Sequence, residues 1–158
     1  MKKTALLLIA ILAISFAKAQ TPTFCEVVNK ILILGNKDKI IELKGDKVDR
    51  KMLFAQQYYK STLALPGFTD PEVKERYHAG CWFSAHILYD NETDMMNTYK
   101  TTQQQIQDCL TATHQKFEFT DNGPDYDVWW QYKKVKLTLH HYVSGKIYVV
   151  DLSFEPPY

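Results

Sequence analysis

The stretch Val135-Lys-Leu-Thr-Leu-His-His-Tyr-Val-Ser-Gly-Lys-Ile-Tyr-Val-Val-Asp-Leu-Ser-Phe154 decides the fold of this chain. Two runs rich in β-branched and aromatic residues flank Ser144-Gly145, a dipeptide typical of turns. A two-residue loop at that dipeptide predicts a hairpin in which Leu139 faces Val150. One face of the hairpin is then almost purely apolar and the other mixed, as in an antiparallel pair with one side on a core.

The first 19 residues predict an export signal and no part of the fold. Two lysines precede an apolar run over Ala5–Phe16, and Ala17-Lys18-Ala19 places small residues before a cleavage site. The apolar run has 12 residues, fewer than the roughly 20 needed to span a bilayer. We therefore predict that Met1–Ala19 is a cleaved signal peptide and that the mature protein is periplasmic or extracellular, with no membrane span.

Composition limits the class of partner. The whole chain has 19 Lys and Arg against 18 Asp and Glu. Cleavage would remove three lysines and no acidic residue, which leaves 16 basic residues against 18 acidic residues and a net charge of −2. This balance gives no electrostatic case for nucleic acid. The 139 residues over 20–158 predict a single α+β domain with an adequate core.

Apolar periodicity predicts two helices and a series of strands. A first helix follows Thr23, a possible N-cap, and runs from Phe24 to about Leu34. A second begins at Thr93 or Asp94 and ends near Thr113, with a buried stripe of Met95, Met96, Tyr99, Thr102, Ile106, Cys109 and Leu110. Strands are predicted at Ile40–Leu43, Gln57–Leu65, Tyr77–Tyr89, around Phe117 and Phe119, at Val128–Tyr132 and in the final hairpin, with a turn at Thr69–Glu72.

This order, α-β-β-β-α-β-β-β, predicts an α+β fold. One-sided alternation in the strands favours an antiparallel β-sheet with two helices packed on one face. A tandem of two αβββ units is an equally open topology. In its order of elements alone the chain resembles the type III secretion chaperone-like fold, a likeness that implies no function.

Three cysteines in an exported protein suggest one disulfide bond and one free thiol. Cys81 lies about 26 Å before the end of its predicted strand at Tyr89, and Cys109 lies about 22 Å into the returning helix. A helix that folds back over its own strand would bring the two level, so a Cys81–Cys109 bridge is the leading hypothesis. A Cys25–Cys109 bridge between the two helices is the second. Three reduced, buried thiols are a third possibility.

The polar face of the hairpin is the best candidate site. If the Tyr77–Tyr89 strand shares the sheet, its outward side chains lie in the same plane as those of the hairpin. The candidate surface then comprises Trp82, Ser84, His86, Lys136, Thr138, His140, Tyr142 and Asp151. Aromatic rings mixed with hydrogen-bonding groups resemble the composition of a recognition surface, although an ordinary exposed sheet face would also satisfy the pattern.

Two classes of function fit these residues. The first is a binding or interaction module without chemistry of its own, which holds a peptide, protein or glycan partner on the open sheet face. The second is a hydrolase, metal-assisted or dependent on His86 and His140, with Asp151 as the orienting carboxylate. The sequence contains no G-x-S-x-G, P-loop, dinucleotide fingerprint, H-E-x-x-H or C-x-x-C motif, so we expect no cofactor. Neither the partner nor the oligomeric state follows from the sequence.

Overall fold

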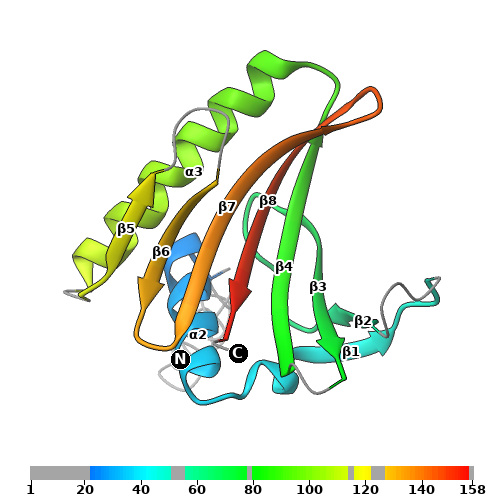
Figure 1. Ribbon diagram of the computed structural model, residues 1–158, viewed down its shortest axis with the longest axis vertical. Helices are drawn as coiled ribbons and strands as arrows, with labels where there is room; N and C mark the ends of the chain where they lie inside the picture. The colour runs from blue at the N-terminus through cyan, green and yellow to red at the C-terminus, as the bar shows by residue number, and fades with distance from the viewer. Residues whose placement is uncertain (1–21, 51–55, 78–79, 114–115, 122–126, 157–158) are drawn as a thin grey trace, which may run out of the picture.

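The computed structural model describes residues 22–50, 56–77, 80–113, 116–121 and 127–156. The predicted signal peptide and its cleavage site lie outside these ranges. The elements are α2 (Phe24–Asn36), the 3₁₀ helix η1 (Ile40–Leu43), β1 (Lys44–Lys47), β2 (Gln56–Ser61), β3 (Thr69–Arg76), β4 (Gly80–Tyr89), α3 (Glu92–Ala112), β5 (Glu118–Asp121), β6 (Val128–Tyr132), β7 (Val135–Ser144) and β8 (Ile147–Glu155). The described strands form one antiparallel sheet in the order β1-β2-β3-β4-β8-β7-β6-β5 (Figure 1).

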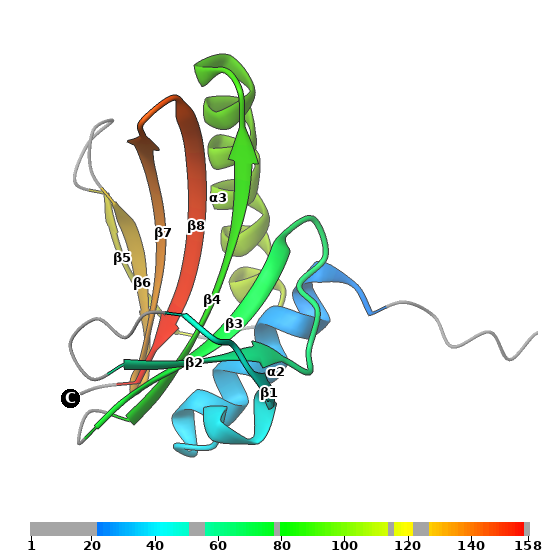
Figure 2. The same cartoon turned by 90° about the vertical axis from the view of Figure 1, so that its right-hand side faces the viewer.

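The sheet consists of two similar halves. In each half a helix precedes four strands that pair in sequence, and the last strands of the halves, β4 and β8, pair with each other. Both helices lie on the same face of the sheet (Figure 2). The predicted α+β class, with two helices on one face of an antiparallel sheet, is therefore confirmed. Each half has four strands, where the predicted order had three.

Two strands of the first half, β1 and β3, were not predicted, and β3 lies where a turn was predicted at Thr69–Glu72. Asp70 has a positive φ of 43°, and the β3–β4 ladder shifts register between Thr69 and Glu72. The β2–β3 ladder begins only at Glu72, so the missing N–H of Pro71 interrupts no bond to β2. A bulge at a strand end is one of the few places that accommodate proline in a sheet. This explains why turn-forming residues belong to a strand here.

The short apolar run Ile40–Leu43 forms η1 and not the predicted strand. Ile40 and Leu43 are both buried, and residues three apart lie on the same side of a 3₁₀ helix. The same run would also suit a half-buried strand, because four residues are too few to separate the two periodicities.

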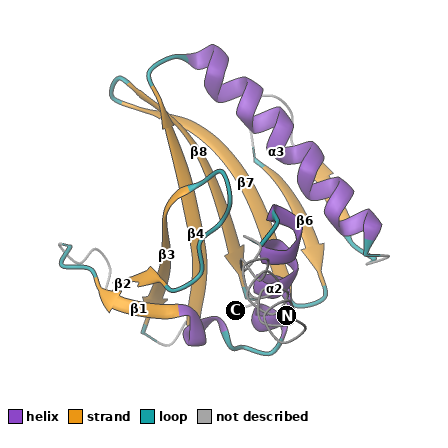
Figure 3. Cartoon of the chain, turned by 180° about the vertical axis from the view of Figure 1, so that it is seen from behind, coloured by secondary structure: helices purple, strands orange, loops and turns teal. Residues whose placement is uncertain are grey.

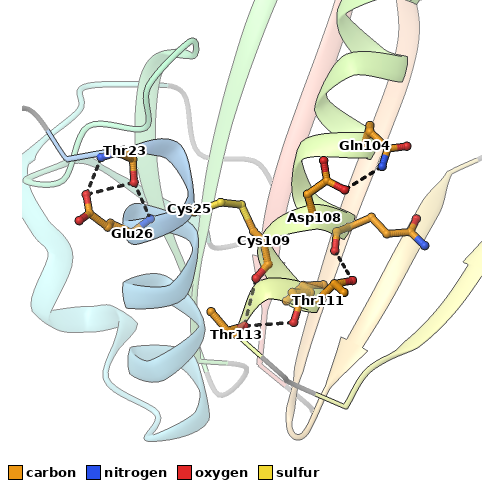
Figure 4. The surroundings of a disulfide bond; sticks show 10 residues. Thr23, Cys25, Glu26, Gln104, Asp108, Cys109, Thr111 and Thr113 are labelled. Carbon is orange, nitrogen blue, oxygen red and sulfur yellow. Dashed lines mark hydrogen bonds between the residues drawn. A yellow bond between two sulfur atoms is a disulfide. The ribbon is translucent and has the colours of Figure 1, made fainter.

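Helix α2 begins as predicted. Thr23 is the N-cap, and its side chain and that of Glu26 form a reciprocal capping box (Figure 4). The C-terminal end of α2 packs closely on β7, because a Cβ atom at Gly35 would lie only 2.7 Å from Cγ2 of Val135. Glycine at this position therefore allows the helix to approach the sheet.

Helix α3 is N-capped by Asn91, slightly before the predicted start, and C-capped at Thr113 as predicted. It crosses the helix-bearing face of the sheet diagonally (Figure 3). Its buried residues are those of the predicted stripe except Met96, which is partly buried and packs against the core. The opposing sheet residues that complete the core include Phe83, Ala85, Trp130, Val135, Leu137, Leu139, Val150, Leu152 and Phe154.

The predicted hairpin is present as β7 and β8, but its predicted register was wrong by two residues. Gly145 and Lys146 form the loop, one residue later than predicted. Gly145 has a positive φ of 65°, which fits the first central position of a type II′ turn. Leu139 therefore faces Leu152 instead of Val150. Because side chains alternate with a period of two, every side chain of the hairpin keeps its predicted face.

The disulfide bond joins Cys25 of α2 to Cys109 of α3, with Cα atoms 5.3 Å apart (Figure 4). This is the second predicted pairing, and the leading one, Cys81–Cys109, was wrong. That pairing required α3 to run back along β4, antiparallel to it. Because α3 crosses from β4 over β8 and β7, Cys109 lies beside α2 and away from Cys81. Cys81 is a free, half-buried thiol.

Candidate functional site: the outer face of the central strands

The candidate residues lie on the outer face, by which we mean the face of the sheet opposite α2 and α3. They belong to β4, β8 and β7, which are adjacent strands in the middle of the sheet. Phe83 and Ala85 are buried on the helix side, so the alternating residues between and beside them point outward. All eight candidate residues share this face: Trp82, Ser84, His86, Lys136, Thr138, His140, Tyr142 and Asp151.

The strand register arranges these residues in rows across the sheet. His86 of β4 pairs with Asp151 of β8, which in turn pairs with His140 of β7. We call these three residues the His-Asp-His row. The neighbouring row places Ser84 beside Ser153, and Ser153 beside Thr138. Two residues farther along, Lys136 faces Glu155.

Several polar side chains of the outer face are buried although no described helix covers them. Ser84 is 3% exposed, Thr138 is 9% exposed and Glu72 is 7% exposed. Arg50 binds Glu72 with two hydrogen bonds, at 2.8 Å and 3.3 Å. Burying a carboxylate is costly without a charged partner, so this bidentate pair stabilises the β2–β3 side of the face.

Cations lie over the aromatic rings of the outer face. The Arg76 guanidinium is 5.7 Å from the centre of the Trp82 ring, and the Lys136 ammonium is 5.3 Å from that of Trp129. At these distances cation–π attraction favours the contact between each cation and its ring. The face therefore presents aromatic rings next to charged groups.

Asp151 is the acidic residue of the His-Asp-His row, and its pKa is shifted. Burial raises the pKa of its carboxyl group, while the interactions with Lys74, His86 and His140 oppose that rise and Glu155 adds to it. Asp151 occupies the central strand with a histidine on each side. Its carboxylate is thus a partly desolvated acceptor at the centre of the face.

The His140 side chain contacts both Asp127 and Tyr142. Its Nδ1 contacts Oδ1 of Asp127, and its ring lies 5.2 Å from the ring of Tyr142 at an interplanar angle of 30°. Burial lowers the pKa of His140, the charge of Asp151 raises it, and His141 lowers it further. A neutral imidazole can donate from Nδ1–H to a carboxylate and keep Nε2 as an acceptor. The geometry therefore orients His140 for hydrogen bonding at Nε2.

The hairpin end of the outer face is apolar. Leu88 of β4 pairs with Val149 of β8, which pairs with Tyr142 of β7. Leu88 is 53% exposed and Tyr142 is 41% exposed, whereas Val149 is buried between them. Ile147, two residues before Val149, is also exposed. The His-Asp-His row is thus bordered by an apolar patch on one side and by serine and threonine hydroxyls on the other.

The burial of Asp151 predicts an unusual dependence of stability on pH. Because the pKa of Asp151 is raised in the folded state above its ordinary value of 3.8, the folded protein keeps this proton to higher pH than the unfolded chain does. The protonated Asp151 carboxyl group therefore contributes to stability at pH values below 3.8. This contribution is lost as the pH rises through the pKa that Asp151 has in the folded protein. Asp151→Asn removes this loss, so the variant should gain stability relative to the parent between pH 4 and pH 7. Urea unfolding of both proteins across this range measures the difference, and a relative loss at the higher pH would contradict the prediction.

Sequence reasoning found the central residues of the face but missed their partners. Asp127, Glu72 and Arg50 were not among the candidate residues, because each reaches the face from another strand or a connecting segment. Trp129 lies in the predicted strand Val128–Tyr132 and was not among the candidate residues either. Once the β6–β7 register is known, Trp129 pairs with Thr138, which places it on the outer face.

Comparisons with known proteins gave no match: no protein-family model, curated protein or solved structure matches this chain. Within the described ranges, no helix is long and apolar enough to cross a membrane. Among the same residues, no group of three or more His, Cys, Asp and Glu side chains is arranged to hold a metal ion. The assignment of function therefore depends on the outer face itself.

Proposed function

We propose that the mature protein is a small exported binding module that holds a peptide, protein or glycan partner on the outer face and performs no chemistry of its own. The observation that carries the proposal is the arrangement of β4, β8 and β7. Their outward side chains form a continuous surface in the middle of the sheet, while both helices pack on the other side.

The chemistry of the face supports recognition. Interfaces combine aromatic rings, which supply contact area at low entropic cost, with polar groups that fix orientation. Trp82 and Tyr142 provide rings at opposite ends of the candidate surface, and the His-Asp-His row provides donors and acceptors between them. The apolar patch around Leu88 extends the surface beyond the polar rows.

Export is supported by two independent features. The N-terminal segment has the pattern of a signal peptide. The disulfide between Cys25 and Cys109 is compatible with an oxidising compartment, where such bonds persist. A periplasmic or extracellular partner is therefore proposed.

Trp82→Ala and Tyr142→Ala test the binding role. Residues 20–158 of the parent and of each variant are immobilised and exposed to an extract of the source cell envelope and to a glycan array. We expect a ligand that the parent retains to be lost by both variants, because each removes a ring from the face. Lys100→Ala on α3 is the matched control and should retain the ligand. Equal binding by the parent and both variants, with unchanged melting temperatures, would show that the outer face is not the site.

A His-dependent hydrolase is the second candidate, favoured by the contact between Asp127 and His140. A carboxylate that orients an imidazole beside a second, partly desolvated carboxyl group is an arrangement used in general acid–base catalysis. In this alternative His140 would act as the base and Asp151 as the acid. Asp127, and not Asp151, would be the orienting carboxylate.

His140→Gln separates the two candidates. Hydrolysis of ester, amide and glycoside substrates by the parent, lost in His140→Gln and kept in His141→Gln, would establish the hydrolase. His141 is a suitable control because it lies on the opposite face, with its ring 4.6 Å from that of Tyr99. No turnover by the parent would contradict the hydrolase and leave the binding role to be judged by the Trp82 and Tyr142 variants.

A further inference from the structure

A basic cleft lies away from the outer face, between the end of α2 and the turn that joins β6 to β7. The two segments lie side by side at the same end of the molecule (Figures 1 and 3). The cleft has a volume of about 400 Å³, within the range of small-ligand sites. Its lining residues are Ile33, Asn36, Lys37, Tyr132, Lys133 and Lys134.

The side chain of Asn36 links the end of α2 to the β6–β7 turn by hydrogen bonds. Its Oδ1 accepts a hydrogen bond from the backbone N–H of Lys134 at 3.0 Å, and its Nδ2 donates to the carbonyl oxygen of Leu32 at 2.8 Å. Lys133 has a positive φ of 52°, a conformation that costs energy for a residue with a side chain. The turn is thus a fixed feature that holds two consecutive lysines against the helix end.

The charged side chains that line the cleft are all basic. Three of its six lining residues are lysines and none is acidic, although acidic residues outnumber basic ones in the predicted mature chain. Like charges gathered in a concave site repel one another and raise the local concentration of anions. Lys133 also lies over the Tyr132 ring at 5.2 Å, which keeps its ammonium group at the cleft.

The rest of the lining is apolar enough to contact a carbon skeleton. Ile33 is 50% exposed, so its side chain is accessible in the cleft. Tyr132 packs partly against the core, so its ring is held in place. An isolated inorganic ion held by the lysines would make no use of either side chain.

We infer that this cleft binds a phosphate or sulfate ester of a sugar, with the tetrahedral oxyanion among Lys37, Lys133 and Lys134 and the sugar ring against Ile33 and Tyr132. Lysine ammonium groups bind such oxyanions through charge-assisted hydrogen bonds. Three of them suit a phosphate monoester, which carries more than one negative charge at neutral pH, better than a sulfate monoester, which carries one. The inference is independent of the function proposed for the outer face.

A structural role for the lysines makes a different prediction. The carboxyl end of α2 carries a partial negative charge, and nearby cations stabilise such helix ends. If the lysines serve only this purpose, their removal lowers stability and leaves ligand binding unchanged. Measuring both quantities on the same variants separates the two roles.

The experiment is a calorimetric titration of residues 20–158 with glucose 6-phosphate, glucose 6-sulfate, glucose and inorganic phosphate at low ionic strength. We expect both esters to bind, glucose not to bind, and inorganic phosphate to bind more weakly than the esters. The double variant Lys133→Gln/Lys134→Gln should weaken ester binding by about tenfold or more, since it removes two charged donors. Lys100→Gln, which changes an exposed lysine of α3 outside the lining of the cleft, should bind as the parent does. Raising the salt concentration should weaken binding by the parent.

Three results would overturn the inference. The first is the absence of ester binding by the parent at millimolar concentration. The second is equal binding by the parent and the double variant, whether or not the variant melts at a lower temperature. The third is equal affinity for glucose 6-phosphate and inorganic phosphate, which would show that the sugar makes no contact.

Discussion

Replacing Cys25 and Cys109 together by alanine should lower the free energy of unfolding by about 3–5 kcal/mol. The bridge joins residues separated by 84 positions, and a covalent link across so long a segment restricts the unfolded chain strongly. It also connects α2 of the first half to α3 of the second. Urea unfolding of the oxidised parent and the double variant measures the difference.

The third cysteine provides the control for this measurement. Cys81 is half-buried and forms no disulfide bond, so Cys81→Ala should cost about 1 kcal/mol or less. A double variant as stable as the parent would contradict a stabilising Cys25–Cys109 bridge. A larger loss from Cys81→Ala than from the double variant would point to a different pairing.

Phe83→Ala should destabilise the protein by about 3–5 kcal/mol. Phe83 is fully buried on the helix side of β4, and its ring packs edge-on against that of Phe154 of β8 with centroids 5.7 Å apart. Truncation would leave a cavity at the junction between the halves, which a close-packed core cannot fill without strain. Equilibrium unfolding in urea, with the midpoint and slope compared, gives the effect.

Trp82→Ala is the matched control, because Trp82 precedes Phe83 on the same strand and points to the outer face. We expect it to cost about 1 kcal/mol or less, even though more side-chain volume is removed than at Phe83. Comparable losses for the two variants would mean that the outer face contributes to the core. They would also remove the basis for using Trp82→Ala as a binding probe.

Local patterns along the chain predicted much of the fold. The Thr23 cap, the buried stripe of α3 and the strand Val128–Tyr132 were predicted closely, because each depends on neighbouring residues. The two faces of the final hairpin were also correct. Its register was not, since Gly145 can occupy either position of a two-residue loop and both choices keep the same side chains on the same face.

Features that depend on distant segments were harder to predict. The disulfide pairing required the direction of α3 across the sheet, which the spacing of Cys81 and Cys109 does not contain. The strand at Thr69–Arg76 was not predicted because Asp70 and Pro71 are residues that ordinarily indicate a turn. In the candidate site, the contact between Asp127 and His140 depends on how β6 is placed beside β7.

The His-Asp-His row forms only when β4 pairs with β8. Strands within each half are neighbours in sequence and close short loops, whereas this pair joins Tyr89 to Tyr148 and closes a much longer one. His86 belongs to the first half, and Asp151 and His140 belong to the second. Neither half alone carries the complete row, so the proposed recognition surface forms only when the two halves dock.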